Sequence, residues 1–121
     1  MTTVLIVDDY PPFLESARGL LEAGEFEVVG EAGHGTEALR LAAELRPDVV
    51  LLDVHMPDLD GFEVARRLAQ LEAPPVVVLT SSRDDYAALV PASAAHAFVR
   101  KDALSAESLA AAVRGSDPGG A

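Results

Sequence analysis

The stretch VVLLDVHMPDLDG, residues 49–61, decides the fold that the sequence predicts. It opens with four consecutive apolar residues, a pattern typical of a strand that is buried on both faces. The strand ends at Asp53, and a turn at Asp60-Gly61 follows. Because an unpaired charge is costly to bury, the carboxylate at the end of this strand needs an explanation from the rest of the chain.

Short apolar runs alternate with amphipathic stretches along the whole chain. The apolar runs predict strands at residues 4–7, 26–29, 49–52, 76–79 and 97–100. The stretches between them predict a helix over residues 13–21, one after an N-cap at Thr36, one after a capping box at Asp60 and Glu63, one that begins near Asp84, and one capped by Ser105 with Leu104 and Leu109 as a hydrophobic staple. Pro91 is expected to break or kink the fourth helix.

Five strands that alternate with five helices predict an α/β fold, with a parallel sheet covered on both faces. The expected sheet is doubly wound and flavodoxin-like, with strand order 2-1-3-4-5. This order places the first strand beside the third, and open α/β proteins bind ligands at the carboxyl ends of such strands. We expect residues 1–115 to form one domain and residues 116–121 to be a flexible tail or the start of a linker.

The composition excludes several classes of protein. The net charge of −11 and the absence of clustered Lys and Arg argue against direct nucleic-acid binding. No apolar run approaches the length of a membrane span. The N-terminus lacks the basic and apolar regions of a signal peptide, and the chain has no cysteine. We therefore expect a cytoplasmic globular protein without membrane association.

Polar residues stand where four of the predicted strands end: Asp8 and Asp9, Asp53, Thr80 and Lys101. Adjacent strands lie about 4.8 Å apart, so the three carboxylates would share one small crevice. They would repel one another unless their pKa values rise or a cation neutralises them. Hard oxygen ligands with open coordination positions suit Mg²⁺.

Lys101 is the only lysine of the chain, whose other basic side chains, apart from histidine, are arginines. A single lysine at a strand end suggests a need for a compact ammonium group. Its flexible stem must lean inward by roughly two strand spacings to reach Asp53. A metal ion, an ammonium and a hydroxyl around one carboxylate form a phosphoryl site, with Asp53 as the nucleophile.

The motifs VLIVDD, GHGTEAL, RPDVVLLDVHMPDLDG, VVVLTS and FVRKD, which span residues 3–104, resemble the receiver domains of two-component response regulators. The similarity is closest to the NarL/LuxR-type subfamily, which is often fused to helix-turn-helix output domains. The resemblance implies a phosphoacceptor switch and no turnover enzyme. Its partners would be a sensor histidine kinase, a fused or separate output domain, and, as a further option, a second copy in a homodimer.

The resemblance also implies roles for individual residues. Asp53 would accept a phosphoryl group from a phosphohistidine. Asp9 would bind Mg²⁺ directly, Asp8 mainly through water, and His55 through its backbone carbonyl. Thr80 and Lys101 would contact phosphoryl oxygens.

Other positions are implied to modulate this chemistry. Phe98 occupies the position of an aromatic residue that moves inward as the threonine is drawn to the phosphate. The side chains of His55 and Ser82 would tune the lifetime of the phosphoryl group.

The three histidines, which have no metal-ligand spacing, are expected to be partly solvated. Asp58 and Asp60 are interpreted as turn and cap residues.

Three alternatives compete with this interpretation. A haloacid-dehalogenase-like phosphatase would need an Asp-x-Asp motif after the first strand, where this chain has adjacent aspartates. A flavodoxin would need a phosphate loop in place of the acidic residues 8–9. The third alternative is a degenerate receiver that acts as a phosphorylation-independent interaction module. Pro91 leaves that alternative open. The resembled subfamily usually has a Gly-Ala pair where this chain has Ala94-Ala95, and a glycine at the position of Ala97, which adds doubt about the region between the last two strands.

Overall fold

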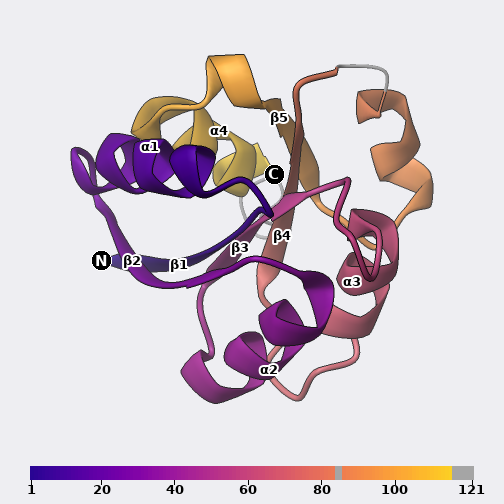
Figure 1. Ribbon diagram of the computed structural model, residues 1–121. Helices are drawn as coiled ribbons and strands as arrows, with labels where there is room; N and C mark the ends of the chain where they lie inside the picture. The colour runs from indigo at the N-terminus through magenta and orange to yellow at the C-terminus, as the bar shows by residue number, and fades with distance from the viewer. Residues whose placement is uncertain (84–85, 116–121) are drawn as a thin grey trace.

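A computed structural model describes residues 1–83 and 86–115 of the 121-residue chain. Its sheet contains β1 (Thr2–Val7), β2 (Phe26–Ala32), β3 (Val49–Asp53), β4 (Val76–Ser81) and β5 (Ala97–Arg100). Every pairing is parallel, and the order is β2-β1-β3-β4-β5 (Figure 1). The predicted flavodoxin-like sheet is therefore confirmed. The expected tail at residues 116–121 lies outside the described residues.

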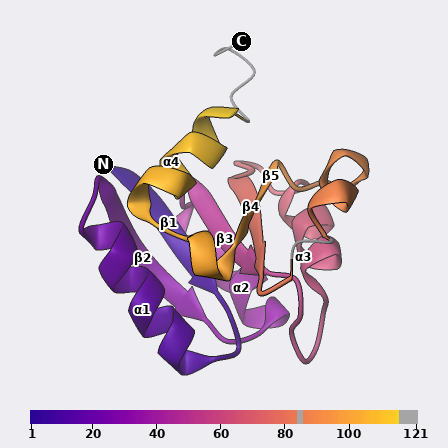
Figure 2. The same cartoon turned by 90° about the horizontal axis from the view of Figure 1, so that it is seen from above.

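Helices cover both faces of this sheet, as predicted. The α-helices are α1 (Pro11–Glu22), α2 (Gly35–Leu45), α3 (Gly61–Leu68) and α4 (Ala106–Gly115). Figures 1 and 2 show α1 and α4 together on one face, and α2 and α3 on the other. In the described part of the chain, no helix has the length and apolar character needed to cross a membrane.

The helical connection between β4 and β5 is a 3₁₀ helix, η1 (Ala87–Ala92), with Pro91 inside it. A proline lacks the N–H of an α-helical hydrogen bond, and its ring clashes with the preceding turn. Pro91 was expected to break or kink the fourth helix, and the structure has a short 3₁₀ helix there. The predicted start near residue 84 lies outside the described residues. A second 3₁₀ turn, η2 (Lys101–Ala103), follows β5 directly.

The strands are apolar on both faces because each face packs against its own layer of helices. Leu5, Val50 and Leu79 belong to the core cluster that includes residues of α2 and α3. Their neighbours point to the opposite face, where the second cluster includes residues of α1 and α4. Both layers are needed to bury the sheet, which explains the runs without alternation.

The helix caps agree with the sequence in two cases and differ in one. The side chain of Asp60 accepts a hydrogen bond from the N–H of Glu63, and Ser105 Oγ accepts one from the N–H of Ser108. The Glu63 carboxylate pairs with two arginines of α3, which differs from a reciprocal capping box. At α2 the predicted cap Thr36 is wrong: the helix begins at Gly35, and the cap is His34.

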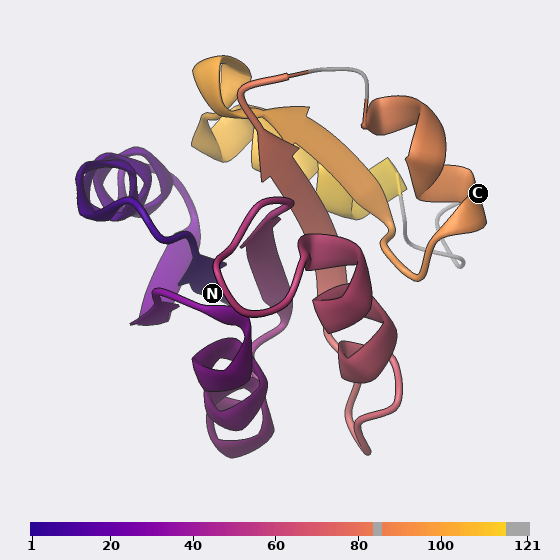
Figure 3. The same cartoon turned by 45° about the vertical axis from the view of Figure 1, so that its right-hand side comes forward.

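The connection from β3 to α3 leaves the sheet at the carboxyl ends of the strands, and Figure 3 brings it forward. It ends at Gly61, whose N–H donates to the carbonyl of Val54 over 2.8 Å. A Cβ at Gly61 would lie 2.6 Å from the carbonyl oxygen of Asp53 and 2.9 Å from the Cα of Val54. The loop that follows Asp53 therefore needs glycine at this position.

We predict that Gly61→Ala lowers the free energy of unfolding by about 1–3 kcal/mol, because backbone atoms must shift to admit the methyl group. Gly19→Ala is the matched control. No atom lies within 4 Å of a Cβ at that position of α1, so the change should raise stability by about 0.5–1 kcal/mol. Urea unfolding measures both values. Equal stability of Gly61→Ala and the parent chain would contradict the close approach.

Candidate functional site

The predicted polar residues meet at the carboxyl edge of the sheet. Asp8 follows β1 directly, Asp53 is the last residue of β3, and Lys101 follows β5. Thr80, in β4, is the register partner of Asp53. The sheet order alone brings these positions to one edge, because parallel strands end on the same side.

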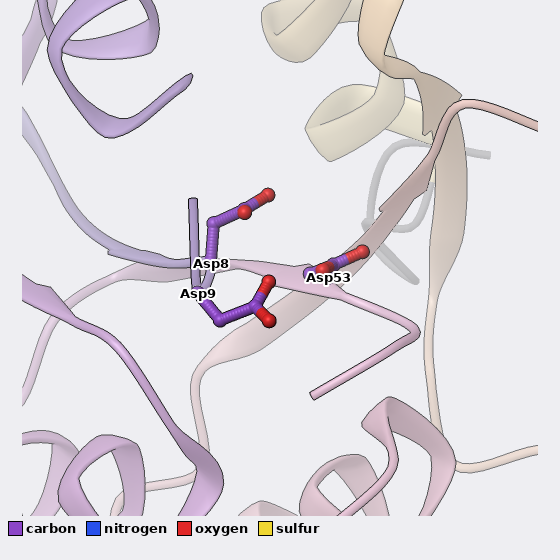
Figure 4. Close-up of side chains that lie close together, drawn as sticks. All are labelled: Asp8, Asp9 and Asp53. Atoms are coloured by element: carbon purple, nitrogen blue, oxygen red, sulfur yellow. The ribbon is translucent and has the colours of Figure 1, made fainter. Parts of the chain in front are cut away.

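The three carboxylates lie close together. One ligand atom from each of Asp8, Asp9 and Asp53 lies within 4.8 Å of the others, and Figure 4 shows the three side chains gathered at the ends of β1 and β3. Asp8 is fully buried and Asp53 is 4% exposed, whereas Asp9 is exposed to solvent. The carboxylate of Asp9 is thus in contact with solvent, whereas those of Asp8 and Asp53 are buried.

The ammonium of Lys101 neutralises part of this charge. Its Nζ lies 2.6 Å from Asp8 Oδ2 and 3.6 Å from Asp53 Oδ1. The lysine was expected to lean toward Asp53, and in the structure it lies nearer to Asp8. Asp8 is the more deeply buried of the two carboxylates, so it gains most from a directly opposed charge.

An aromatic ring that sequence analysis did not assign to the site also contacts this lysine. Lys101 Nζ lies 4.7 Å from the ring centroid of Phe13 in α1, within the range of a cation–π interaction. In the sequence, Phe13 is the first residue of the helix predicted over residues 13–21. No sequence spacing relates Phe13 to Lys101, because the contact depends on how α1 packs beside the end of β5.

The carboxyl group of Asp53 has a raised pKa. Burial, followed by the charge of Asp8, raises the pKa of Asp53 to about 6. Lys101 and the backbone N–H of His55, which hydrogen-bonds to Asp53, act in the opposite direction, and Asp9 adds a smaller upward contribution. The site therefore favours any partner that brings positive charge to Asp53.

Thr80 contributes a buried hydroxyl. The residue is 1% exposed, and its Oγ1 has no hydrogen-bond partner among the described residues. A buried hydroxyl without a partner is unfavourable, so this atom is free to bind a group placed on the neighbouring Asp53. Ser82, two residues further on, is exposed, and Phe98 is half-buried against the core.

All three histidines are exposed, which confirms the expected solvation. His34 Nδ1 caps α2 by accepting a hydrogen bond from the N–H of Glu37. His96 Nδ1 accepts one from the N–H of Val77. His55 Nε2 is hydrogen-bonded to the hydroxyl of Tyr86, a contact that sequence analysis did not predict.

Asp58 has a larger structural role than the turn residue that the sequence suggested. Its carboxylate accepts hydrogen bonds from the N–H groups of Gly35 and Thr36 and from the Thr36 hydroxyl. These bonds, with that of the Thr36 N–H the strongest, hold the pKa of Asp58 well below its usual range. Asp58 thereby ties the loop after β3 to the N-terminus of α2, where a negative charge is favourable.

The donor set fits a hard divalent cation. Asp8, Asp9 and Asp53 offer only carboxylate oxygens, and Asp9 leaves the cluster open to water. Mg²⁺ prefers oxygen ligands and keeps several waters of its own. The unfavourable charge on Asp53 is of the kind that such an ion would relieve.

Comparison with protein families gives a match over almost all of the chain. The model of the response regulator receiver domain matches residues 4–114. The signal receiver domain of NarL from Mycobacterium tuberculosis superposes with a TM-score of 0.82 and 35% identity, covering 94% of this chain and 97% of that one. The response regulator domain of Thermotoga maritima CheB gives a TM-score of 0.82 at 28% identity, covering 98% and 99% of the two chains.

Curated relatives are longer proteins. The transcriptional regulatory protein LiaR of Bacillus subtilis is 42% identical over 87 residues, which are 70% of this chain and 41% of that protein. The protein-glutamate methylesterase/protein-glutamine glutaminase 3 of Hahella chejuensis is 48% identical over 79 residues, 65% of this chain and 23% of that protein. The matched segments thus cover less than half of these relatives.

We predict that Asp53→Asn stabilises the chain in the absence of divalent cations, in a pH-dependent way. Between the ordinary pKa of 3.8 and the raised value of about 6, folded Asp53 holds a proton that the unfolded chain has lost. The free energy of unfolding therefore falls as the pH rises through this window. The free energy of unfolding of the variant does not fall in this way, because asparagine does not ionise. The difference between the variant and the parent chain should therefore grow from near zero at about pH 4 to at most roughly 3 kcal/mol above pH 6.

Urea unfolding of both proteins in a chelating buffer, at pH values below, within and above that window, measures the difference. A constant difference at every pH would contradict the raised pKa of Asp53.

Proposed function

The chain belongs to the response regulator receiver family, with NarL/LuxR-type relatives, and on this basis we propose that it is a phosphoacceptor switch of a two-component phosphorelay. Asp53 takes the phosphoryl group from the phosphohistidine of a sensor histidine kinase. The modified carboxylate then shifts the conformation of a partner-binding face. The chain assists its own phosphorylation and dephosphorylation and is not a turnover enzyme.

One observation carries this proposal: Asp53 is buried beside Lys101, two further carboxylates and the Thr80 hydroxyl, which has no hydrogen-bond partner within residues 1–83 and 86–115. A carboxylate kept only for stability would be paired in full and would have a lowered pKa. Burial and Asp8 instead raise the pKa of Asp53. This arrangement favours chemistry at Asp53 over a structural role.

The transfer follows from the positions of these groups. A carboxylate oxygen of Asp53 attacks the phosphorus, the bond from phosphorus to the imidazole nitrogen breaks, and its electron pair stays on the imidazole. The Thr80 hydroxyl donates a hydrogen bond to one phosphoryl oxygen. Lys101 turns from Asp8 toward another, where its ammonium stabilises the negative charge.

Asp8, Asp9, Asp53 and the backbone carbonyl of His55 would hold Mg²⁺. The ion, when bound, supplies positive charge that neutralises the carboxylates and the transferring group. The chain's own contribution is the cluster of carboxylates at the ends of β1 and β3.

Movement of Thr80 toward the phosphate links the site to the rest of the fold. Thr80 lies in β4, one residue after Leu79, which is the register partner of Phe98 in β5. The half-buried Phe98 moves inward as Thr80 is drawn to the phosphate. The two conformations differ in population, and phosphorylation changes their ratio.

We also propose the bounds of the domain, its location in the cell and its partners. Residues 1–115 are the receiver unit, and the protein acts in the cytoplasm. The output domain is fused or separate, and a homodimer is a further arrangement of the active form. Direct binding of nucleic acid is not a role of this chain, because its net charge is −11. The complete acidic set disfavours a degenerate receiver.

We predict that acetyl phosphate or phosphoramidate with Mg²⁺ adds one phosphoryl group to the chain, and that Asp53→Asn abolishes the addition. Intact-mass spectrometry reads out the adduct. Asp60→Asn is the matched control, since it makes the same chemical change in the same loop and asparagine still caps α3. An adduct on Asp53→Asn would place the acceptor elsewhere. No adduct on the parent chain with either donor would favour the interaction module.

We further predict that Mg²⁺ stabilises the chain through Asp9. At ten times its dissociation constant, the ion should raise the free energy of unfolding by roughly 1.4 kcal/mol, and a chelator should remove the gain. Asp9→Asn should lose most of it, because one of the carboxylates is gone. Asp102→Asn, at an exposed carboxylate paired with Arg100, should keep it. Equal gains in both variants would exclude Asp9 as a ligand.

A further inference from the structure

The hydroxyl of Tyr86 joins two segments that flank the phosphoacceptor. Tyr86 Oη lies 2.5 Å from His55 Nε2 and forms a hydrogen bond with it. The two rings meet edge to face, with centroids 5.2 Å apart and an interplanar angle of 72°. His55 belongs to the connection that follows β3, and Tyr86 is the N-cap of η1 after β4. The contact therefore bridges the exits of two neighbouring strands.

The ring of Tyr86 has a second anchor that does not involve its hydroxyl. It packs against Phe62 of α3, with centroids 6.2 Å apart, and Tyr86 is half-buried. Removal of the hydroxyl alone should therefore leave the ring in place. This separates the effect of the hydrogen bond from the effect of packing.

His55 connects this bond to Asp53 through its own backbone. The N–H of His55 donates to the Asp53 carboxylate. The preceding residue, Val54, is fixed on both sides, since its N–H donates to the carbonyl of Thr80 over 3.0 Å and its carbonyl accepts from Gly61. The exposed His55 side chain is held from outside by Tyr86. The Tyr86 hydroxyl thus limits movement at the residue whose amide contacts the acceptor.

Loss of the phosphoryl group requires water at this place. In hydrolysis the water oxygen attacks phosphorus, the bond from phosphorus to the Asp53 oxygen breaks, its electron pair returns to the carboxylate, and a proton from the water passes to solvent. Asp53 is only 4% exposed, so the loops around it control access. A loop that is held in place admits water less often than a loose one.

We propose that Tyr86 is a positioning residue for the phosphorylated state: its hydroxyl holds His55, and with it the loop after β3, so that hydrolysis at Asp53 is slowed. This inference rests on the proposed phosphorylation of Asp53. It extends that function by naming the residue through which the N-terminus of η1 acts on the lifetime of the phosphoryl group.

The test follows the decay of the phosphoryl adduct after the small-molecule donor is removed. The full chain, Tyr86→Phe, His55→Ala and the double variant are phosphorylated with phosphoramidate and Mg²⁺, and intact mass is recorded over time. Each single change should shorten the half-life by about 3- to 10-fold, the effect of one lost hydrogen bond. The double variant should decay no faster than the faster single variant, because both changes remove the same contact.

Tyr10→Phe is the matched control. It removes the same atom from the other tyrosine, which is 60% exposed, and the half-life should not change. The ring-nitrogen resonances of His55 in ¹⁵N NMR spectra should shift in Tyr86→Phe and stay in place in Tyr10→Phe. Such a shift reports the hydrogen bond itself, which a general loss of stability would not reproduce.

The outcomes separate this inference from the proposed function. Absence of an adduct on the parent chain overturns the proposed function and this inference with it. An adduct that decays at the parent rate in Tyr86→Phe overturns the inference alone. Effects that multiply in the double variant also overturn it, because they would show that His55 and Tyr86 act independently.

Discussion

Repulsion among three carboxylates at the ends of β1 and β3 is the constraint on which the site depends. Asp8 is fully buried, and Lys101 lies against it. Asp53, one strand away, is left with a weaker contact to the same ammonium and a pKa of about 6. One positive charge is thus shared by several acids, so a bound cation would relieve the repulsion that remains among them.

The loop after β3 is held at several points, and this keeps the acceptor in a defined place. Asp58 accepts hydrogen bonds from the N-terminus of α2. The N–H of Gly61 donates to the carbonyl of Val54. The side chain of His55 is hydrogen-bonded to Tyr86. Each contact joins the loop to a different neighbour in the sheet or helix layers. The loop that carries the acceptor is therefore joined to α2, α3 and the N-terminus of η1 by direct hydrogen bonds.

The segment between β4 and β5 is the least regular part of the described fold. It is a 3₁₀ helix with Pro91 inside it, and short 3₁₀ helices have poorer hydrogen-bond geometry than α-helices. Leu89 is 49% exposed there. This segment is joined to the loop after β3 by the hydrogen bond between Tyr86 and His55.

The order of the sheet and the residues of the acidic cluster could both be predicted from the amino-acid pattern. Apolar runs without alternation require helices on both faces, and the parallel arrangement of the strands brings Asp8, Asp53 and Lys101 to one edge. Which of these groups are in contact depends on the packing of the folded chain. Lys101 lies nearer to Asp8 than to Asp53, and Tyr86 meets His55, because such contacts depend on loop paths and helix packing, which leave no periodic signal in the chain.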